Sequence, residues 1–265
     1  MIIDFHTHCF PGKIAEKAME TLIRNAGAAT AYHDGPEQSL SKKIRDMGAD
    51  IAVVLNISTN PKQQKSVNDY AIEINGFGGL VAFGSVFPDS PQALYELERL
   101  HDAGVKGIKF HPDYQNFFVD DPRVFPLYKK AAALGLITVF HTGVDIGLPD
   151  PVHCAPKALA KVLPVFEGGT VVAAHFGGYM LWKEALEYLA GTGVYIDTSY
   201  SHSHLPPPWA KELIEAFGAK KTLLGSDMPW NATDNEIRFI QSLGLSEADE
   251  NLILGVNARE LLGIA

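Results

Sequence analysis

Ten histidines stand out among the 265 residues, because imidazole both binds metal ions and moves protons near neutral pH. Two of them, His6 and His8, are one residue apart at the end of an apolar run near the N-terminus. Side chains two apart on a strand point to the same face, so both imidazoles can reach one ion. Asp4 shares this face and is better placed to support a ligand than to bind the ion itself. The pair therefore predicts a metal site at the end of the first strand.

Three more groups of this kind follow other short apolar runs, namely His141, His175 and Asp227. Imidazole suits zinc and manganese among other ions, and a set of histidines with one carboxylate can leave a position open to water. The pattern predicts an open site for a divalent cation, with zinc as the first choice and manganese as the alternative.

The elements that must position these groups alternate along the whole chain. Between the apolar runs lie helical patterns, such as Pro91–Ala103, Pro122–Leu134, Tyr179–Ala190, Pro208–Phe217 and Asn235–Leu243. Most of the runs are continuously apolar, as is typical of parallel strands buried on both faces. The eight expected strands are Ile2–His6, Ile51–Ile57, Leu80–Val86, Gly107–His111, Ile137–His141, Thr170–His175, Val194–Thr198 and Thr222–Ser226. Eight strand–helix units over this length predict a single (β/α)8 barrel, a TIM barrel, spanning residues 1–265.

Chemistry in such a barrel lies at the carboxyl ends of the strands. His6, His141, His175 and Asp227 all fall there, and the fourth strand adds Lys109 and His111. Because these strand ends share one rim, we expect the groups to converge on one site.

Composition excludes several classes of protein. The chain has 22 basic and 31 acidic residues, a formal charge of −9, and no basic run, so a nucleic-acid partner is not expected. No apolar stretch is long enough to cross a membrane, and the N-terminus lacks the pattern of a signal peptide. Two cysteines cannot form a disulfide framework. These features favour a cytoplasmic protein with a small-molecule substrate.

Other polar and aromatic residues are weaker candidates. Tyr114 lies in an aromatic segment, 111–118, that we expect to form a pocket wall or lid on the rim, and Trp230 is a second expected wall. Asp197 ends the seventh strand and is either a substrate contact or the cap of a turn. The second His-x-His pair, His202 and His204, lies in a proline-rich loop that would not preorganise metal ligands.

The chain resembles the amidohydrolase superfamily over nearly its full length. The segments that carry the resemblance are Asp4–His8 (DFHTH), Val139–Gly143 (VFHTG), Ala174–Gly178 (AHFGG), Gly225–Trp230 (GSDMPW) and Gly255–Gly263 (GVNARELLG), the last being similar to the closing helix of the family. The most similar branch is the amidohydrolase-related group, which contains aminocarboxymuconate-semialdehyde decarboxylase, resorcylate-type decarboxylases and lactone or amide hydrolases.

The resemblance implies roles for these residues. His6, His8 and His141 would hold the metal, with Asp227 as a ligand or proton shuttle. His175 would either bind a second metal or orient water and polarise the substrate. Lys109 matches a lysine that is carbamylated and bridges two metals in binuclear members. Decarboxylases of the group are typically mononuclear, so one ion is favoured over two.

Unmodified, Lys109 would remain an ammonium group and bind a substrate carboxylate, with His111, Tyr114 and Trp230 as further substrate contacts. The favoured function is hydrolysis of an amide, lactone or related bond in a small carboxylate-bearing substrate, with Asp227 and His175 as the catalytic residues. The alternative is non-oxidative decarboxylation, which would use the same constellation. Relatives often form dimers, and a homodimer stays open because the sequence shows no interface.

Overall fold

A computed structural model describes residues 1–25 and 30–264. It contains the eight expected strands; the first is shifted by one residue, and the other seven are somewhat shorter than their apolar runs. They are β1 (Ile3–Thr7), β2 (Ile51–Leu55), β3 (Leu80–Phe83), β4 (Gly107–Phe110), β5 (Ile137–Phe140), β6 (Val171–Ala173), β7 (Tyr195–Asp197) and β8 (Thr222–Leu223). All paired strands are parallel, in the orders β1-β2-β3 and β4-β5-β6-β7-β8.

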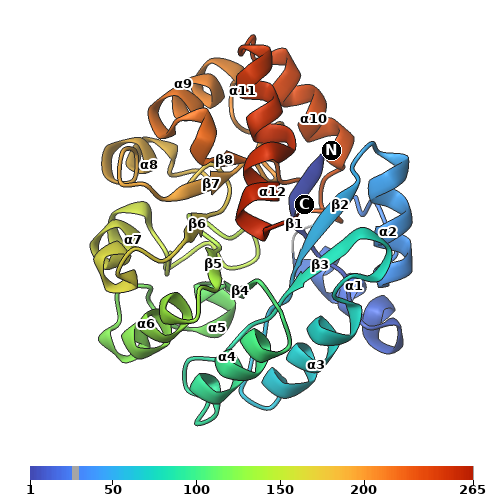
Figure 1. Cartoon of the computed structure of the whole chain (residues 1–265), viewed down its shortest axis with the longest axis vertical. Coiled ribbons are helices and arrows are strands. Elements are labelled where there is room, and N and C mark those ends of the chain that lie inside the picture. Colours follow the sequence, from blue (N-terminus) through green and yellow to red (C-terminus); the bar gives the residue numbers. More distant parts are fainter. Residues whose placement is uncertain (26–29, 265) are drawn as a thin grey trace.

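Isolated contacts join the two groups of strands. Gly84 bridges to Ile108 between β3 and β4, and Thr7 bridges to Met228 beyond the end of β8. The backbone N–H of Phe5 also donates to the carbonyl of Leu224 at 2.7 Å. Figure 1 shows the strands at the centre with the helices around them. The fold is the (β/α)8 barrel that the sequence predicts.

The helices follow the strands in turn. They are α1 (Gly12–Asn25), α2 (Glu37–Asp46), α3 (Gln64–Ile74), α4 (Ala93–Asp102), α5 (Pro112–Gln115), α6 (Phe125–Ala133), α7 (Pro156–Val162), α8 (Trp182–Tyr188), α9 (Pro207–Phe217), α10 (Thr233–Ser242), α11 (Glu247–Asn251) and α12 (Asn257–Leu262). The helix expected from Tyr179 begins later, because Tyr179 instead forms a β-bridge with Gly143 after β5. Among the described residues, no helix is long and apolar enough to cross a bilayer.

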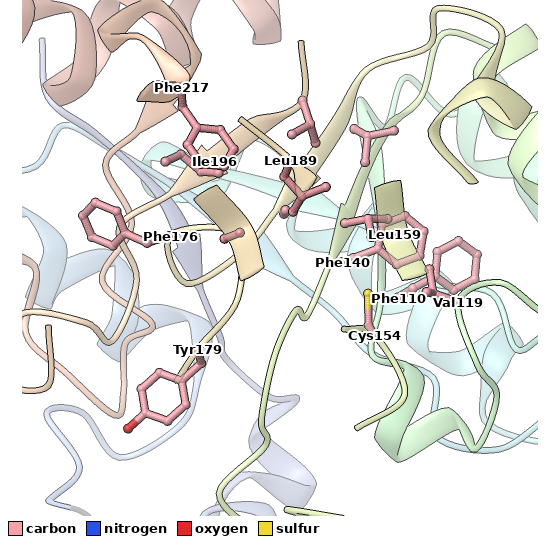
Figure 2. Packing of buried hydrophobic residues seen from close by; sticks show 14 of the residues in the cluster. Phe110, Val119, Phe140, Cys154, Leu159, Phe176, Tyr179, Leu189, Ile196 and Phe217 are labelled. Carbon is pink, nitrogen blue, oxygen red and sulfur yellow. The ribbon is translucent and has the colours of Figure 1, made fainter. Parts of the chain in front are cut away.

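Two layers of side chains hold the barrel together. Val53, Val139, Val172 and Leu223 belong to one buried cluster with residues of β1, and they come from four different strands. The outer layer packs the helices on the strands, and its aromatic part includes Phe140 of β5. Figure 2 shows part of this outer layer. Cores this dense fix the strand ends, and therefore the groups at the rim.

The C-terminal helix, α12, covers the end of the barrel opposite to the carboxyl ends of the strands. Ala258 and Leu262 of α12 are buried against Ile3 and Phe5 of β1. A side chain at Gly255 would collide with the carbonyl oxygen of Met1, so only glycine allows this approach. The helix lies beside β1 in Figure 1. The expected closing role of 255–263 is confirmed.

Candidate metal centre and active site

A cavity of about 610 Å³ opens at the carboxyl ends of the strands. The residues of the sequence prediction that line it are His6, His8, Lys109, His111, Tyr114, His141, His175, Asp227 and Trp230. The fold therefore brings all nine predicted site residues to one cavity.

Three groups converge at one point of the cavity. The Nε2 atoms of His6 and His8 lie 3.3 and 3.1 Å from Oδ1 of Asp227. Nδ1 of His8 lies 2.9 Å from the carbonyl oxygen of Leu55. Because Nδ1 must donate to that oxygen, the neutral ring presents the lone pair of Nε2 to the cavity.

The backbone after β8 places Asp227 against this pair. Asp227 has a left-handed φ of 69°, and its N–H donates to the carbonyl of His6 at 2.7 Å. Burial alone would raise the pKa of Asp227, but the imidazoles of His6, His8 and His175 hold it well below its usual range. The carboxylate is therefore anionic and available to a cation.

Asp197 holds His6 from the opposite side of the ring. Its Oδ2 lies 2.9 Å from Nδ1 of His6. Its Oδ1 accepts from the backbone N–H groups of His175 and Ser199 at 3.0 and 3.1 Å, and also from Oγ of Ser199. Asp197 therefore supports a ligand, and it is absent from the residues that line the cavity. Neither alternative raised from the sequence, a substrate contact or a turn cap, describes this role fully.

His141 and His175 form a second pair. Nδ1 of His141 lies 3.0 Å from Nε2 of His175, while Nδ1 of His175 lies 3.1 Å from the carbonyl oxygen of Ser199. Nε2 of His141 is buried and has no hydrogen-bond partner. Burial, together with His111 and His175, holds the pKa of His141 well below its usual range. A buried imidazole nitrogen without a partner is uncommon and suits a ligand atom.

Lys109 lies between the two groups of histidines. The side chain is buried, and its Nζ is 3.3 Å from Nε2 of His6. Burial lowers its pKa to about 8, while Asp197 and Asp227 oppose the shift. Most of the lysine is therefore still charged at neutral pH, and the ammonium group can reach an anion bound beside His6.

His111 lies on the β4 side of the cavity. Its ring stacks on that of His141 at 4.1 Å, and its Nε2 lies 3.3 Å from Oδ2 of Asp145. Tyr114 packs edge-on against the same ring. Asp145 follows β5 and also lines the cavity, a contact that sequence reasoning missed because Asp145 lies in a loop beyond the strand end.

The walls differ in part from the prediction. Trp230 lines the cavity as expected, together with Tyr200. The two phenylalanines of segment 111–118 do not line it, so that part of the wall prediction is wrong. Phe117 is buried against Phe110, and Phe118 is half exposed beside His153. Burial in the hydrophobic core, rather than the cavity, therefore explains Phe117.

A buried acid of α10, Glu236, lies against the proline-rich loop. Oε1 of Glu236 accepts from the amide of Asn231 at 2.7 Å and lies 3.2 Å from Nδ1 of His202, while Oε2 is buried without a partner. Burial raises the pKa of Glu236 to about 7, although the contact with His202 opposes the shift. His202 lies outside the main cavity, in keeping with the low metal-binding expectation for this loop.

Glu236 should make stability fall as the pH rises. Between pH 4.5 and 7 the folded chain keeps a proton that the unfolded chain has lost, so deprotonation through this window costs up to about 3 kcal/mol. Glu236→Gln should remove this component, so the variant should gain stability relative to wild type from pH 5 to pH 8. Urea unfolding of both proteins at the two pH values tests this. Parallel pH profiles would contradict it.

The residues present fit a divalent cation. His6, His8 and Asp227 bring one ligand atom each to within 4.8 Å of the others, and so do His111, His141 and Asp145. The first set offers two imidazole nitrogens and a carboxylate, which suit zinc or manganese. His141, which the resemblance implies as a ligand of the same ion as His6 and His8, falls in the second set instead. In His6 and His8, Nδ1 is hydrogen-bonded to Asp197 and to the carbonyl of Leu55, so the lone pair of each Nε2 faces the cavity. Such a contact on the far side of the ring is usual for metal-binding histidines.

A family described as amidohydrolase matches residues 3–264. The chain belongs to the amidohydrolase family. It is therefore an enzyme of this family, and the resemblance drawn from the strand-end motifs is confirmed. A comparison with curated proteins finds no match.

Solved structures agree on the fold. A 2,6-dihydroxybenzoate decarboxylase in complex with 2,6-dihydroxybenzoate is 17% identical, with 99% of each chain covered and a TM-score of 0.74. A dihydroxybenzoic acid decarboxylase from Polaromonas sp. JS666, with bound manganese and the inhibitor 2-nitroresorcinol, is 14% identical. The match covers 99% of this chain and 97% of that one, with a TM-score of 0.73. A Pseudomonas putida protein assigned as a 2-pyrone-4,6-dicarboxylic acid hydrolase is 17% identical. The match covers 99% of this chain and 97% of that one, with a TM-score of 0.68.

Proposed function

We propose that this enzyme is a metal-dependent, non-oxidative decarboxylase of a small carboxylate-bearing substrate, formed by a single domain over residues 1–265. The observation that carries the proposal is the buried Lys109 ammonium group beside the His6–His8–Asp227 cluster, at the base of a cavity. A buried cation of this kind recruits an anionic group. Because most of the cavity lining is apolar, it removes water from the bound carboxylate.

His6, His8 and Asp227 would hold the ion, and we propose zinc, with manganese as the alternative. When bound, the cation supplies Lewis-acid attraction for the anionic oxygens of the substrate. His8 is fixed for this task by its contact with Leu55, and His6 by its contact with Asp197.

The remaining residues would orient the substrate and move one proton. Lys109 would bind the carboxylate, so that the carbon–carbon bond to be broken lies near His175. With Nδ1 donating to the carbonyl of Ser199, His175 would have to be protonated on both nitrogens to give the Nε2 proton to the carbon that loses carbon dioxide. Asp227, the other candidate donor, would first have to take up a proton. The balance is one carboxylate and one proton in, and one C–H product and carbon dioxide out. His111, Tyr114 and Trp230 would contact the body of the substrate.

The comparisons support decarboxylation over hydrolysis. Two of the solved structures described above are decarboxylases of hydroxylated benzoic acids, and one of them holds manganese. Hydrolysis, the function first expected from the sequence, is the second candidate. It is supported by the likeness to a protein assigned as a 2-pyrone-4,6-dicarboxylic acid hydrolase and by the use of the same residue types in both reactions.

Product analysis in heavy water separates the two reactions. The zinc- or manganese-loaded enzyme is incubated with 2,6-dihydroxybenzoate, related hydroxylated benzoic acids and 2-pyrone-4,6-dicarboxylate. A decarboxylase should release carbon dioxide and place one deuterium on the carbon that held it. Ring opening of the pyrone without carbon dioxide release would instead establish the hydrolase.

Metal content tests the proposed single ion. We expect one equivalent per chain after loading, loss of activity with a chelator, and recovery on adding zinc or manganese. Lys109→Ala should keep that equivalent, because the ammonium group contacts substrate rather than metal. Two equivalents in wild type that fall to one or none in Lys109→Ala would show a bridging, carbamylated lysine, with His141 and His175 at the second ion.

A further inference from the structure

The cavity has two chemically different parts. Its base carries the charged groups described above. A second part, called here the apolar arm, is formed by Ile14, Ala18 and Leu22 of α1 together with Val144 and Ile146 after β5. The chemistry proposed above uses the base alone, so the arm has no role in it.

Helix α1 presents two apolar stripes instead of one. Ala15 and Met19 are buried, and a Cβ atom at Gly35 would lie 2.9 Å from Cβ of Ala15 and 3.1 Å from Cγ of Met19. Ile14, Ala18 and Leu22 are spaced by four residues, so they form a neighbouring stripe along the same helix. The first stripe packs against the loop at Gly35, and the second lines the cavity.

The loop after β5 faces the end of α1. A Cβ atom at Gly147 would lie 3.6 Å from Cβ of Asn25, the last residue of the helix. Ile146, next to Gly147, lines the cavity and is 43% exposed, while Ile14 at the start of α1 is 53% exposed. Both isoleucines therefore line the cavity and leave a large apolar surface in contact with solvent.

Exposure alone would mean little, because single exposed apolar residues are common on proteins. Leu94 on α4 is 46% exposed and is not among the residues that line the cavity. Ile14 differs because it continues a helical stripe along the cavity and has an exposed partner, Ile146, in the same lining. Removing apolar surface arranged in this way from water makes the free energy of ligand binding more favourable.

We propose that the substrate is an amphipathic acid, with its carboxylate at the base and an aliphatic chain or second ring against the apolar arm. The carboxylate part of this proposal rests on the proposed function, and the apolar part rests on the arm. Cavities of roughly 300–1,000 Å³ enclose drug-sized ligands, and the volume here is about 610 Å³. A monocyclic acid with few substituents is much smaller than such a ligand and would leave the arm empty.

Binding of straight-chain alkanoates to the zinc-loaded enzyme tests the arm without any turnover. Calorimetry with butanoate, hexanoate, octanoate and decanoate should show a dissociation constant that falls about two- to fourfold for each added methylene, until the arm is full. Ile14→Ser and Leu22→Ser should flatten this dependence and leave butanoate binding unchanged. Leu94→Ser, a matched change on α4, should behave as wild type.

The outcomes separate the two parts of the proposal. No dependence on chain length, or the same dependence in wild type and in both arm variants, would overturn the apolar arm. The matched 1-alkanols test the head group. Alkanols that bind as tightly as the alkanoates would contradict the carboxylate site of the proposed function while leaving the arm in place. Tighter binding of the alkanoates, with equal methylene increments in both series, is the result we expect.

Discussion

Asp227→Asn should reduce kcat/KM by at least about a thousandfold with the best substrate of the panel, and it should leave the fold intact. The substitution removes the one negative charge in the His6–His8–Asp227 cluster but keeps the shape of the side chain. Asparagine also tolerates the left-handed φ of 69° at this position, so the hydrogen bond from N–H of residue 227 to the carbonyl of His6 should survive.

Two further measurements distinguish a lost ligand from a damaged fold. Metal retained after dialysis should drop together with activity, whereas the melting temperature should change little. Asp46→Asn removes the same charge from an exposed site on α2 that pairs with Lys42, so it is the matched control and should keep wild-type activity. Normal turnover in Asp227→Asn would remove Asp227 from the site.

The sequence was sufficient to predict the barrel and the convergence of the candidate site residues on one cavity. Apolar runs separated by helical patterns predicted eight strands because buried parallel strands have no polar face. The His6–His8 spacing then placed two imidazoles on one face. Because the carboxyl ends of all strands share one rim of a barrel, the other candidate residues were expected beside them. These inferences use only local periodicity and one rule of topology.

The details that the sequence left open depend on contacts between distant strands. Phe117 and Phe118 are adjacent and equally apolar, yet one packs in the core and the other is half exposed outside the cavity. Periodicity cannot distinguish a core from a cavity wall, since both are apolar. In the same way, nothing near Asp197 in the sequence indicates its partner, because His6 lies 191 positions away and approaches it only when the barrel brings β1 next to β8, which pairs with β7.

Asp197→Asn should weaken metal binding by about 10- to 100-fold, the loss typical when the group that supports a ligating histidine is changed. The reason is that Asp197 determines which ring nitrogen of His6 carries the proton. Asp197 accepts from Nδ1 of His6, which leaves the lone pair on Nε2 facing the cavity. The other carboxylate oxygen already accepts from the N–H groups of His175 and Ser199.

An asparagine at this position has one accepting oxygen, and the two N–H donors will keep it. Its amide group then faces Nδ1 of His6 as a donor, so the ring must move its proton to Nε2. A protonated Nε2 cannot bind a cation, so zinc must displace this proton and binds more weakly. Excess zinc should therefore restore part of the activity, which a simple loss of folded protein would not allow.

Ser199→Ala is the matched control for this argument. It removes the hydroxyl that donates to Asp197 and that also lies 3.0 Å from Nδ1 of His6. Because Asp197 keeps its contact with His6 and still accepts the Nδ1 proton, metal affinity should change much less than in Asp197→Asn. Titration of both variants with zinc, read by calorimetry, gives the comparison directly. Equal affinities in wild type and Asp197→Asn would show that the proton on His6 does not depend on Asp197. An equal loss in both variants would instead assign the effect to the buried network as a whole.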